Sequence, residues 1–567
     1  MFFVLGNVLV STESFSFIRL TKKQNYGSVG DGQTSPDPLT RPHGHDLTLL
    51  HAAPSGDDGA TGSVTEDTEQ TALIPLEEEQ DASQASNEAG TGQRILELAV
   101  PALGALLIDP LLTLADTAFV GRFAQSPYEL AGMGSATALL TVRKRPSAFV
   151  ISSLGRCFRA NLFSTTPLVA SKRSSGKEQE AIAVGGQALS LALALGGILA
   201  AALIALRYPL LDLMGISVSG EEATGYAADF LIIRALAAPA VFSISASTGI
   251  LRGYLDTKTP IFVLLVANVV NFLLDVALIV FAGMGPAGAA IATTTAEWIS
   301  ALLFLFVLAG KLPSADGELG KKDEDTIVVT PSLAIPPWEE VKPLVVASSS
   351  VFLRTTVLQL FLSCSAAFAA RGTEMEGGPA ASIAAHQIAI QLWMLCSYTS
   401  DALAAASQGL VADAIGRESP SDVKDVSKTV LVYSSVLGTV LGSILFVGFS
   451  TSFLLNLFTS DQSTQADLMD IAALLIFSQP LNSIVFAADG ILQGASEFPY
   501  QAKSMALSAF VAGSFFWILH SMDISDDLFD VWSALICLQL MRGLTSAYKI
   551  VDDDGPIRLL DNKFEEA

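Results

Sequence analysis

Long apolar stretches fill nearly the whole chain after residue 94, and they limit what the chain can fold into more than any other feature. Twelve of them can be separated, six on each side of a polar segment that runs from Lys311 to Glu340. Each is about 20 residues long or longer, the length at which an α-helix crosses a hydrocarbon core of about 30 Å. The sequence therefore predicts an all-α membrane protein with about twelve transmembrane helices.

The stretches fall into two matching sets. The fourth ends on GILRG at 249–253, and the tenth ends on GILQG at 490–494. Because each set holds six helices, both sets enter the membrane from the same side, which makes them parallel repeats. We therefore expect two pseudo-symmetric six-helix lobes. The expected spans are about 95–120, 130–170, 180–206, 224–251, 260–283 and 286–309, then about 342–370, 380–412, 429–450, 466–492, 502–521 and 528–549.

The composition agrees with a membrane protein and argues against other classes. Hydrophobic residues make up 51% of the 567 residues and charged residues only 16%, whereas a soluble globular chain carries about a quarter charged residues. The bundle leaves no room for a sizeable soluble catalytic domain, so we do not expect an enzyme. The four cysteines form no CxxC pattern, and no two histidines share an expected helix. We expect no metal site, no cofactor other than a coupling ion, and no nucleic-acid partner.

The region before the first span is acidic and poor in apolar residues. Residues 31–93 hold thirteen acidic residues and one basic residue, Arg41, which accounts for half of the net charge of −24. Such a segment cannot bury enough surface to fold alone, and we expect a disordered tail over residues 1–93. Residues 1–24 have an apolar start and later basic residues but lack a basic start and a cleavage site, so a targeting presequence stays an open alternative.

Lysine and arginine gather in the loops on one side of the predicted bundle. The positive-inside rule then places both termini in the cytoplasm, or in the stroma if the membrane is that of a plastid. The expected division is a tail over 1–93, an N-lobe with helices 1–6 over 94–310, a connecting loop over 311–340, a C-lobe with helices 7–12 over 341–550 and a tail over 551–567.

The expected second span departs from a simple transmembrane helix. Its stretch between Ser135 and Thr165 is about a dozen residues longer than one crossing needs at 1.5 Å per residue, and it holds five cations, which are costly to place in lipid. We favour an error in the gene model over residues 141–160, with a genuine cytoplasmic or interfacial insertion as the alternative. The cations are Arg143, Lys144, Arg145, Arg156 and Arg159.

Acidic residues inside the first lobe form one candidate site. Asp116 lies late in the first span, and Asn271 and Asp275 lie four residues apart in the fifth, on one face of a helix. The sixth span adds threonines at 293–295. Two carboxylates beside amide and hydroxyl oxygens can bind a hard monovalent cation or exchange protons. The alternative is that each side chain only makes hydrogen bonds between helices.

Charges inside the second lobe form another candidate site. Arg354 lies about twelve residues into the seventh span, hence about 18 Å deep at the rise of an α-helix. One interpretation pairs Arg354 with an aspartate of the same lobe, Asp401 or Asp489. The other makes Arg354 a bidentate clamp for the carboxylate of a substrate. His386 and Gln387 would then bind the same substrate, and Asp401 and Asp489 complete this candidate substrate site. The alternative for His386 is a packing residue, the more common role of a lone histidine in a helix.

Five stretches carry a family signature in their order and spacing. They are PALGALLIDPLLTLADTAFVGR (101–122), GILRGYLDTKTP (249–260), AAHQIAIQLWMLCSYTSDALAAASQGLVA (384–412), ADGILQGASEF (488–498) and VWSALICLQLMRG (531–543). Together they resemble the DinF-like branch of the multidrug and toxic compound extrusion (MATE) family, and in particular its plant and algal members. The resemblance implies two lobes around a cavity that faces alternate sides, with antiport driven by protons or sodium. It also assigns the coupling cation to Asp116, Asn271, Asp275 and Thr293.

We therefore predict a secondary antiporter that exports a small organic solute in exchange for H⁺ or Na⁺. An organic anion such as citrate or a phenolic acid is favoured, because similar plant members move such carboxylates and Arg354 suits them. The alternatives are a broad-specificity exporter of drug or toxin cations, a flippase for lipid-linked precursors, and a membrane scaffold that transports nothing. We expect a monomer in the bilayer of the plasma membrane or of an organelle such as a plastid.

Overall fold

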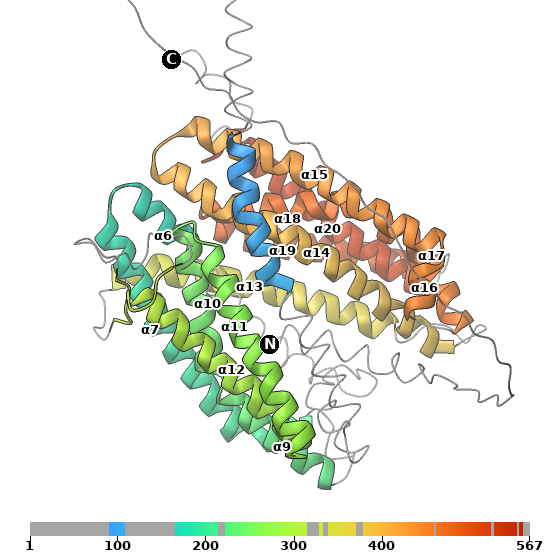
Figure 1. Ribbon diagram of the computed structural model, residues 1–567. Helices are drawn as coiled ribbons and strands as arrows, with labels where there is room; N and C mark the ends of the chain where they lie inside the picture. Colours follow the sequence, from blue (N-terminus) through green and yellow to red (C-terminus); the bar gives the residue numbers. More distant parts are fainter. Residues whose placement is uncertain are drawn as a thin grey trace, which may run out of the picture. The chain divides into compact units, whose positions relative to one another are not determined.

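The computed structural model describes residues 90–107, 165–213, 221–314, 328–332, 338–369, 378–458, 461–522, 527–552 and 555–559 (Figure 1). All regular secondary structure in these ranges is helical, which confirms the predicted all-α class. The first helix runs through 90–107 and so includes residues 90–93, which we had assigned to the acidic tail. Asp116 and the unusual stretch at 141–160 lie outside the described residues.

The first set of helices agrees with the expected spans wherever the structure describes it. Two expected spans are interrupted, one between α9 and α10 and one where α11 continues as the π-helix η3. After the helix over 90–107, the elements are α6 (Thr165–Ser174), α7 (Glu178–Ala205), α8 (Arg207–Leu213), α9 (Glu221–Ala235), α10 (Ala238–Gly253), α11 (Lys258–Asp275), η3 (Val276–Phe281) and α12 (Gly285–Leu308).

The second set repeats this arrangement, with an interruption between α17 and α18. Among the described residues, seven helices are long and apolar enough to cross a membrane, or nine if each of two bent pairs counts as one span. The elements are α13 (Trp338–Ala369), α14 (Gly378–Gly416), α15 (Pro420–Ser450), α16 (Phe453–Phe458), α17 (Gln462–Phe477), α18 (Gln479–Gly494), α19 (Phe498–Met522) and α20 (Asp527–Val551).

Large apolar side chains on the outer faces of the helices identify the surface that meets lipid. Phe262 of α11 is 65% exposed, and Phe510 and Trp517 of α19 are 73% and 70% exposed. In water such a surface would aggregate, whereas in a bilayer it lies against acyl chains. The buried faces carry alanine and polar residues together with large apolar ones, such as Phe304 and Trp532. The polar groups inside each bundle are therefore the place to look for function.

Both sets contain a helix that is broken at the same place in the repeat. α9 and α10 meet at an angle of 41°, and α17 and α18 meet at 49°. Each second half begins with a proline in its first turn, Pro239 or Pro480, which lacks the N–H that would continue the preceding helix. A glycine lets a neighbouring helix approach: a Cβ on Gly196 would lie 2.5 Å from the Cα of Pro239, and one on Gly438 would lie 2.6 Å from the Cα of Pro480.

The GILRG and GILQG motifs mark a second pair of equivalent contacts. A Cβ on Gly253, at the end of α10, would lie 2.8 Å from the Cβ of Val169 in α6. A Cβ on Gly494, at the end of α18, would lie 2.8 Å from the Cβ of Val411 in α14. Both valines stand in the sequence LVA, at 168–170 and 410–412. The glycines thus permit the same close helix packing in each lobe, which supports the predicted duplication.

Candidate functional site

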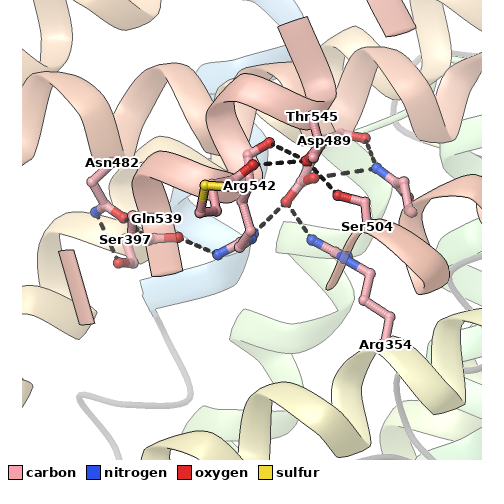
Figure 2. Close-up of polar contacts among 10 residues, drawn as sticks. Arg354, Ser397, Asn482, Asp489, Ser504, Gln539, Arg542 and Thr545 are labelled. Carbon is pink, nitrogen blue, oxygen red and sulfur yellow. Dashed lines mark hydrogen bonds and ion pairs between the residues drawn. The ribbon is translucent and has the colours of Figure 1, made fainter. Parts of the chain in front are cut away.

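A carboxylate held between two guanidinium groups forms the centre of the C-lobe polar network. Figure 2 shows Asp489 of α18 accepting hydrogen bonds from Arg354 of α13 and from Arg542 of α20. Gln501 of α19 adds two more, from Nε2 to the backbone oxygen of Asp489 at 2.9 Å and to Oδ1 at 3.3 Å. The Asp489 side chain is 8% exposed. Three helices therefore donate hydrogen bonds to one buried aspartate of a fourth.

The network continues from Arg542 through uncharged side chains. Arg542 donates to Oε1 of Gln539 at 2.5 Å, and Gln539 donates from Nε2 to Oδ1 of Asn482 at 2.6 Å. Asn482 then donates to the Oγ of Ser397 in α14 at 3.1 Å (Figure 2). These contacts satisfy Nη1 and Nη2 of Arg542 and the amide groups of Gln539 and Asn482 that take part in them, as a low-dielectric interior favours. Arg542 is thereby fixed at both ends of its guanidinium group.

Two further charges lie within electrostatic reach of this network. Asp401 of α14 interacts with Arg354, with Asp489 and with Arg252 at the end of α10. Arg252 is only 7% exposed. With Arg542, the described residues of this cluster comprise three arginines and two aspartates, a formal excess of one positive charge. A buried excess of that sign attracts an anion.

The structure does not bring every residue of the predicted substrate site together. Arg354, Asp401 and Asp489 belong to the cluster, but His386 lies fifteen residues before Asp401 on α14, or about 22 Å along the helix. His386 is buried and packs against the ring of Trp532, with 5.9 Å between ring centroids. Its neighbour Gln387 lies in the same turn of α14. The predicted site therefore separates into a charged cluster and a distant aromatic contact.

The N-lobe brings two of its predicted coupling residues into direct contact. Asn271 donates from Nδ2 to Oδ2 of Asp275 at 2.9 Å, and both side chains are buried. α11 gives way to the π-helix η3 directly after Asp275, and single turns of π-helix occur frequently at functional sites. Thr293 lies on α12, which packs on α11, and its hydroxyl donates to the backbone oxygen of Ala289 at 2.8 Å.

Sequence reasoning missed an ion pair inside the N-lobe. Arg234 of α9 donates from Nη2 to both carboxylate oxygens of Glu297 in α12, at 2.8 Å each. The side chains are 3% and 16% exposed. Each residue stands inside an apolar span, within LIIRAL and TAEWIS. An arginine in one apolar span and a glutamate in another span of the same lobe were the signal that could have revealed the pair.

An ion pair also connects α6 with α14, which belong to different sets of helices. Nη2 of Arg173 lies 3.0 Å from Oδ1 of Asp413, and Nη1 of Arg173 donates to the backbone oxygen of Tyr254 at 2.9 Å. Arg417 donates to the other oxygen of Asp413 at 3.1 Å. The helix over 90–107 adds an apolar contact, since Ile95 packs with residues of α14, α15 and α18.

Comparison with known proteins gives consistent matches along most of the chain. A family model described as MatE matches residues 101–277 and 347–518. Protein DETOXIFICATION 44, chloroplastic, of Arabidopsis thaliana is 28% identical over 479 residues, which are 83% of this chain and 84% of the relative. DNA damage-inducible protein F of Escherichia coli is 28% identical over 462 residues, 79% and 90% of the two chains.

A solved structure supports the fold. It is described as the outward-facing conformation of a multidrug resistance MATE family transporter of the MOP superfamily. The TM-score is 0.66 at 18% sequence identity, over 80% of this chain and 94% of the other. At that identity the likeness concerns the two-lobed fold alone.

Proposed function

This chain belongs to the MatE family of membrane transporters, and we propose that it is a secondary antiporter that exports a small organic anion in exchange for H⁺ or Na⁺. The observation that carries the choice of an anion is the cluster of Arg252, Arg354 and Arg542, which the described part of the chain balances with two aspartates. Low-dielectric surroundings strengthen the attraction between such an excess charge and a carboxylate.

Arg354 is the member of the cluster best suited to meet the substrate. Its side chain is 17% exposed, whereas that of Arg542 is 4% exposed and donates to both Asp489 and Gln539. Because Arg542 also neutralises Asp489, Arg354 can turn toward a substrate without leaving that aspartate unpaired. A guanidinium group binds a carboxylate through two parallel hydrogen bonds, which a lysine cannot do.

Coupling is assigned to the N-lobe. A proton or sodium ion that binds at Asp275 and Asn271, together with Asp116 and Thr293, changes the charge of a buried cluster and so shifts the balance between the outward-facing and inward-facing states. Moving that balance from nearly all of one state to nearly all of the other takes about 5.5 kcal/mol of differential binding. Asp275 and Asp116, the latter predicted from the sequence, carry sufficient charge to supply it in a low-dielectric interior.

An exporter of drug or toxin cations is the second candidate, because the same acids of the N-lobe would attract a cationic solute. Relatives described as DETOXIFICATION proteins and as multidrug resistance proteins favour it. A flippase for lipid-linked precursors and a scaffold that transports nothing remain alternatives of other classes. The chloroplastic relative supports a plastid membrane, for which we propose that both termini lie in the stroma.

The test is uptake into proteoliposomes that contain the purified full-length protein. Radiolabelled citrate, a phenolic acid such as ferulate and a cationic dye are compared under imposed gradients of protons or of sodium. We expect accumulation of at least one carboxylate, driven by one of the two gradients and blocked when that gradient is dissipated. Accumulation of the dye with no transport of either carboxylate would contradict the anion assignment and favour the second candidate.

A further inference from the structure

The break in the fourth span leaves carbonyl groups that α12 satisfies. The last carbonyls of a helix have no partner within it, and inside a bilayer water cannot replace that partner. α9 ends at Ala235, and Pro239 has no N–H to offer to the preceding turn. α12 supplies two donors: the hydroxyl of Thr294 to Ile233 O at 3.2 Å, and Nε1 of Trp298 to Leu236 O at 3.1 Å.

The same turn of α12 also supplies the charge that neutralises Arg234. Glu297 accepts from Nη2 of Arg234 at 2.8 Å, and Nη1 of Arg234 donates to the hydroxyl of Thr294 at 3.1 Å. Thr294, Glu297 and Trp298 stand at i, i+3 and i+4, and so share one face of the helix. One face of α12 is therefore fixed to the broken end of α9 by hydrogen bonds and an ion pair.

This attachment sets the rotation of α12 about its own axis. Thr293 directly precedes Thr294, and successive residues of an α-helix are rotated by about 100°. With Thr294 held against α9, Thr293 takes a fixed direction in the bundle where α12 packs on α11. α11 carries Asn271 and Asp275, which are already in contact with each other at 2.9 Å.

We propose that Arg234 and Glu297 are positioning residues for the cation-coupling site. Their ion pair holds α12 against the break in the fourth span, and thereby holds the hydroxyl of Thr293 in register with Asn271 and Asp275. The inference rests on the proposed coupling function of those residues. The pair does not itself bind the ion. Groups that orient a ligand of a bound cation typically change its affinity by about 10- to 100-fold when they are removed.

Ion binding to the purified protein tests this directly, since it needs no knowledge of the exported solute. ²²Na⁺ binding and proton uptake are measured for wild type, Glu297→Gln, Arg234→Lys and Asp275→Asn. We expect Asp275→Asn to abolish binding of the coupling ion and Glu297→Gln to raise its half-saturating concentration by about tenfold. Arg234→Lys keeps the charge but loses part of the hydrogen bonding, and it should fall between Glu297→Gln and wild type.

A positioning role and a purely structural role of Glu297 predict different effects on carboxylate transport. In proteoliposomes, Glu297→Gln should leave the KM of the transported carboxylate within about twofold of wild type, because Arg354, the residue assigned to meet the substrate, lies in the other lobe. If Glu297→Gln fails to fold, the double variant Arg234→Gln and Glu297→Gln, which strands no charge, takes its place with the same expected shift. The proposal would be overturned if Glu297→Gln or the double variant folds and binds the ion with wild-type affinity while Asp275→Asn abolishes binding. Undiminished binding in Asp275→Asn would instead overturn the coupling site, and the positioning role with it.

Discussion

The two broken spans are held by different chemistry although they occupy equivalent places in the two lobes. In the N-lobe the break between α9 and α10 is held by α12, through Thr294, Trp298 and the ion pair of Arg234 with Glu297. In the C-lobe the contacts at the break between α17 and α18 come from uncharged groups. Ser478 and Gln479 donate to Leu475 O at 3.0 and 2.8 Å.

The charged cluster around Asp489 lies instead farther along α18. Asp489 stands ten residues after Gln479, which is about 15 Å along the helix. The duplicated bundle thus keeps the break in both lobes and places its buried charge differently. We infer that the ion pair at the break of the N-lobe supports the site of the coupling ion, whereas the charged cluster of the C-lobe binds the solute.

The largest effect is expected at the coupling residues. Asp275→Asn should abolish gradient-driven export, because an amide has the shape of a protonated acid but cannot release a proton or neutralise a cation. The same change at Asp116, predicted from the sequence, should do likewise. Counterflow exchange should survive in at least one variant, since the solute is assigned to the C-lobe. Accumulation at wild-type rates by both variants would move the search for coupling to Asp401 and Asp489.

The next largest effect distinguishes the two arginines that share Asp489. Arg354→Ala should reduce carboxylate transport by about 10- to 100-fold, equivalent to the 1.5–3 kcal/mol of a hydrogen bond to a charged group. Its folded yield should stay near wild type, because Arg542 still neutralises Asp489. Arg542→Ala is the matched control. It should lower the folded yield, since it removes the donor to Gln539 as well.

Two outcomes would contradict the assignment of Arg354. Normal citrate or ferulate transport by well-folded Arg354→Ala protein would remove it from the substrate site. A loss of folded protein as large as that of Arg542→Ala would identify both arginines as structural partners of Asp489. Size-exclusion chromatography and transport assays on the same preparations separate the two results.

A smaller effect should be equal in both lobes. Gly196→Ala and Gly438→Ala each place a methyl group against the proline at a break, 2.5 or 2.6 Å from its Cα. Such overpacking typically costs about 1–3 kcal/mol. Both variants should lower the melting temperature of the purified protein by similar amounts. A large decrease in one lobe and none in the other would show that the two breaks are not equivalent.

The spans could be predicted from the sequence because lipid imposes both length and apolarity on each helix. From 180 onward, each expected span corresponds to a described helix or to a broken pair. The breaks themselves could not be located, since proline within an apolar stretch is compatible with a kink, a break or an intact helix end. Helix spacing alone brought Asn271 and Asp275 together, because both lie on one helix.

Contacts between helices were harder to predict than contacts within one. The sequence left two aspartates, Asp401 and Asp489, as possible partners of Arg354. That Arg542 shares Asp489 with it could be seen only once the arrangement of α13, α18 and α20 was known. Arg234 and Glu297 were overlooked because they lie in two different spans, and nothing in the sequence shows that these spans pack together. His386 was grouped with Arg354 by residue type, although the rise along α14 places it far from Asp401.

The smallest expected effect comes from the uncharged break of the C-lobe. Gln479→Leu removes one donor to Leu475 O, but Ser478 still donates to the same oxygen at 3.0 Å. The loss of one neutral hydrogen bond costs about 1 kcal/mol or less, so the melting temperature should decrease slightly and the half-saturating concentration of the coupling ion should not change. Glu297→Gln, at the break of the other lobe, should change that concentration by about tenfold. If Gln479→Leu weakens ion binding as much as Glu297→Gln does, the break itself governs coupling in both lobes, and the ion pair is not what distinguishes them.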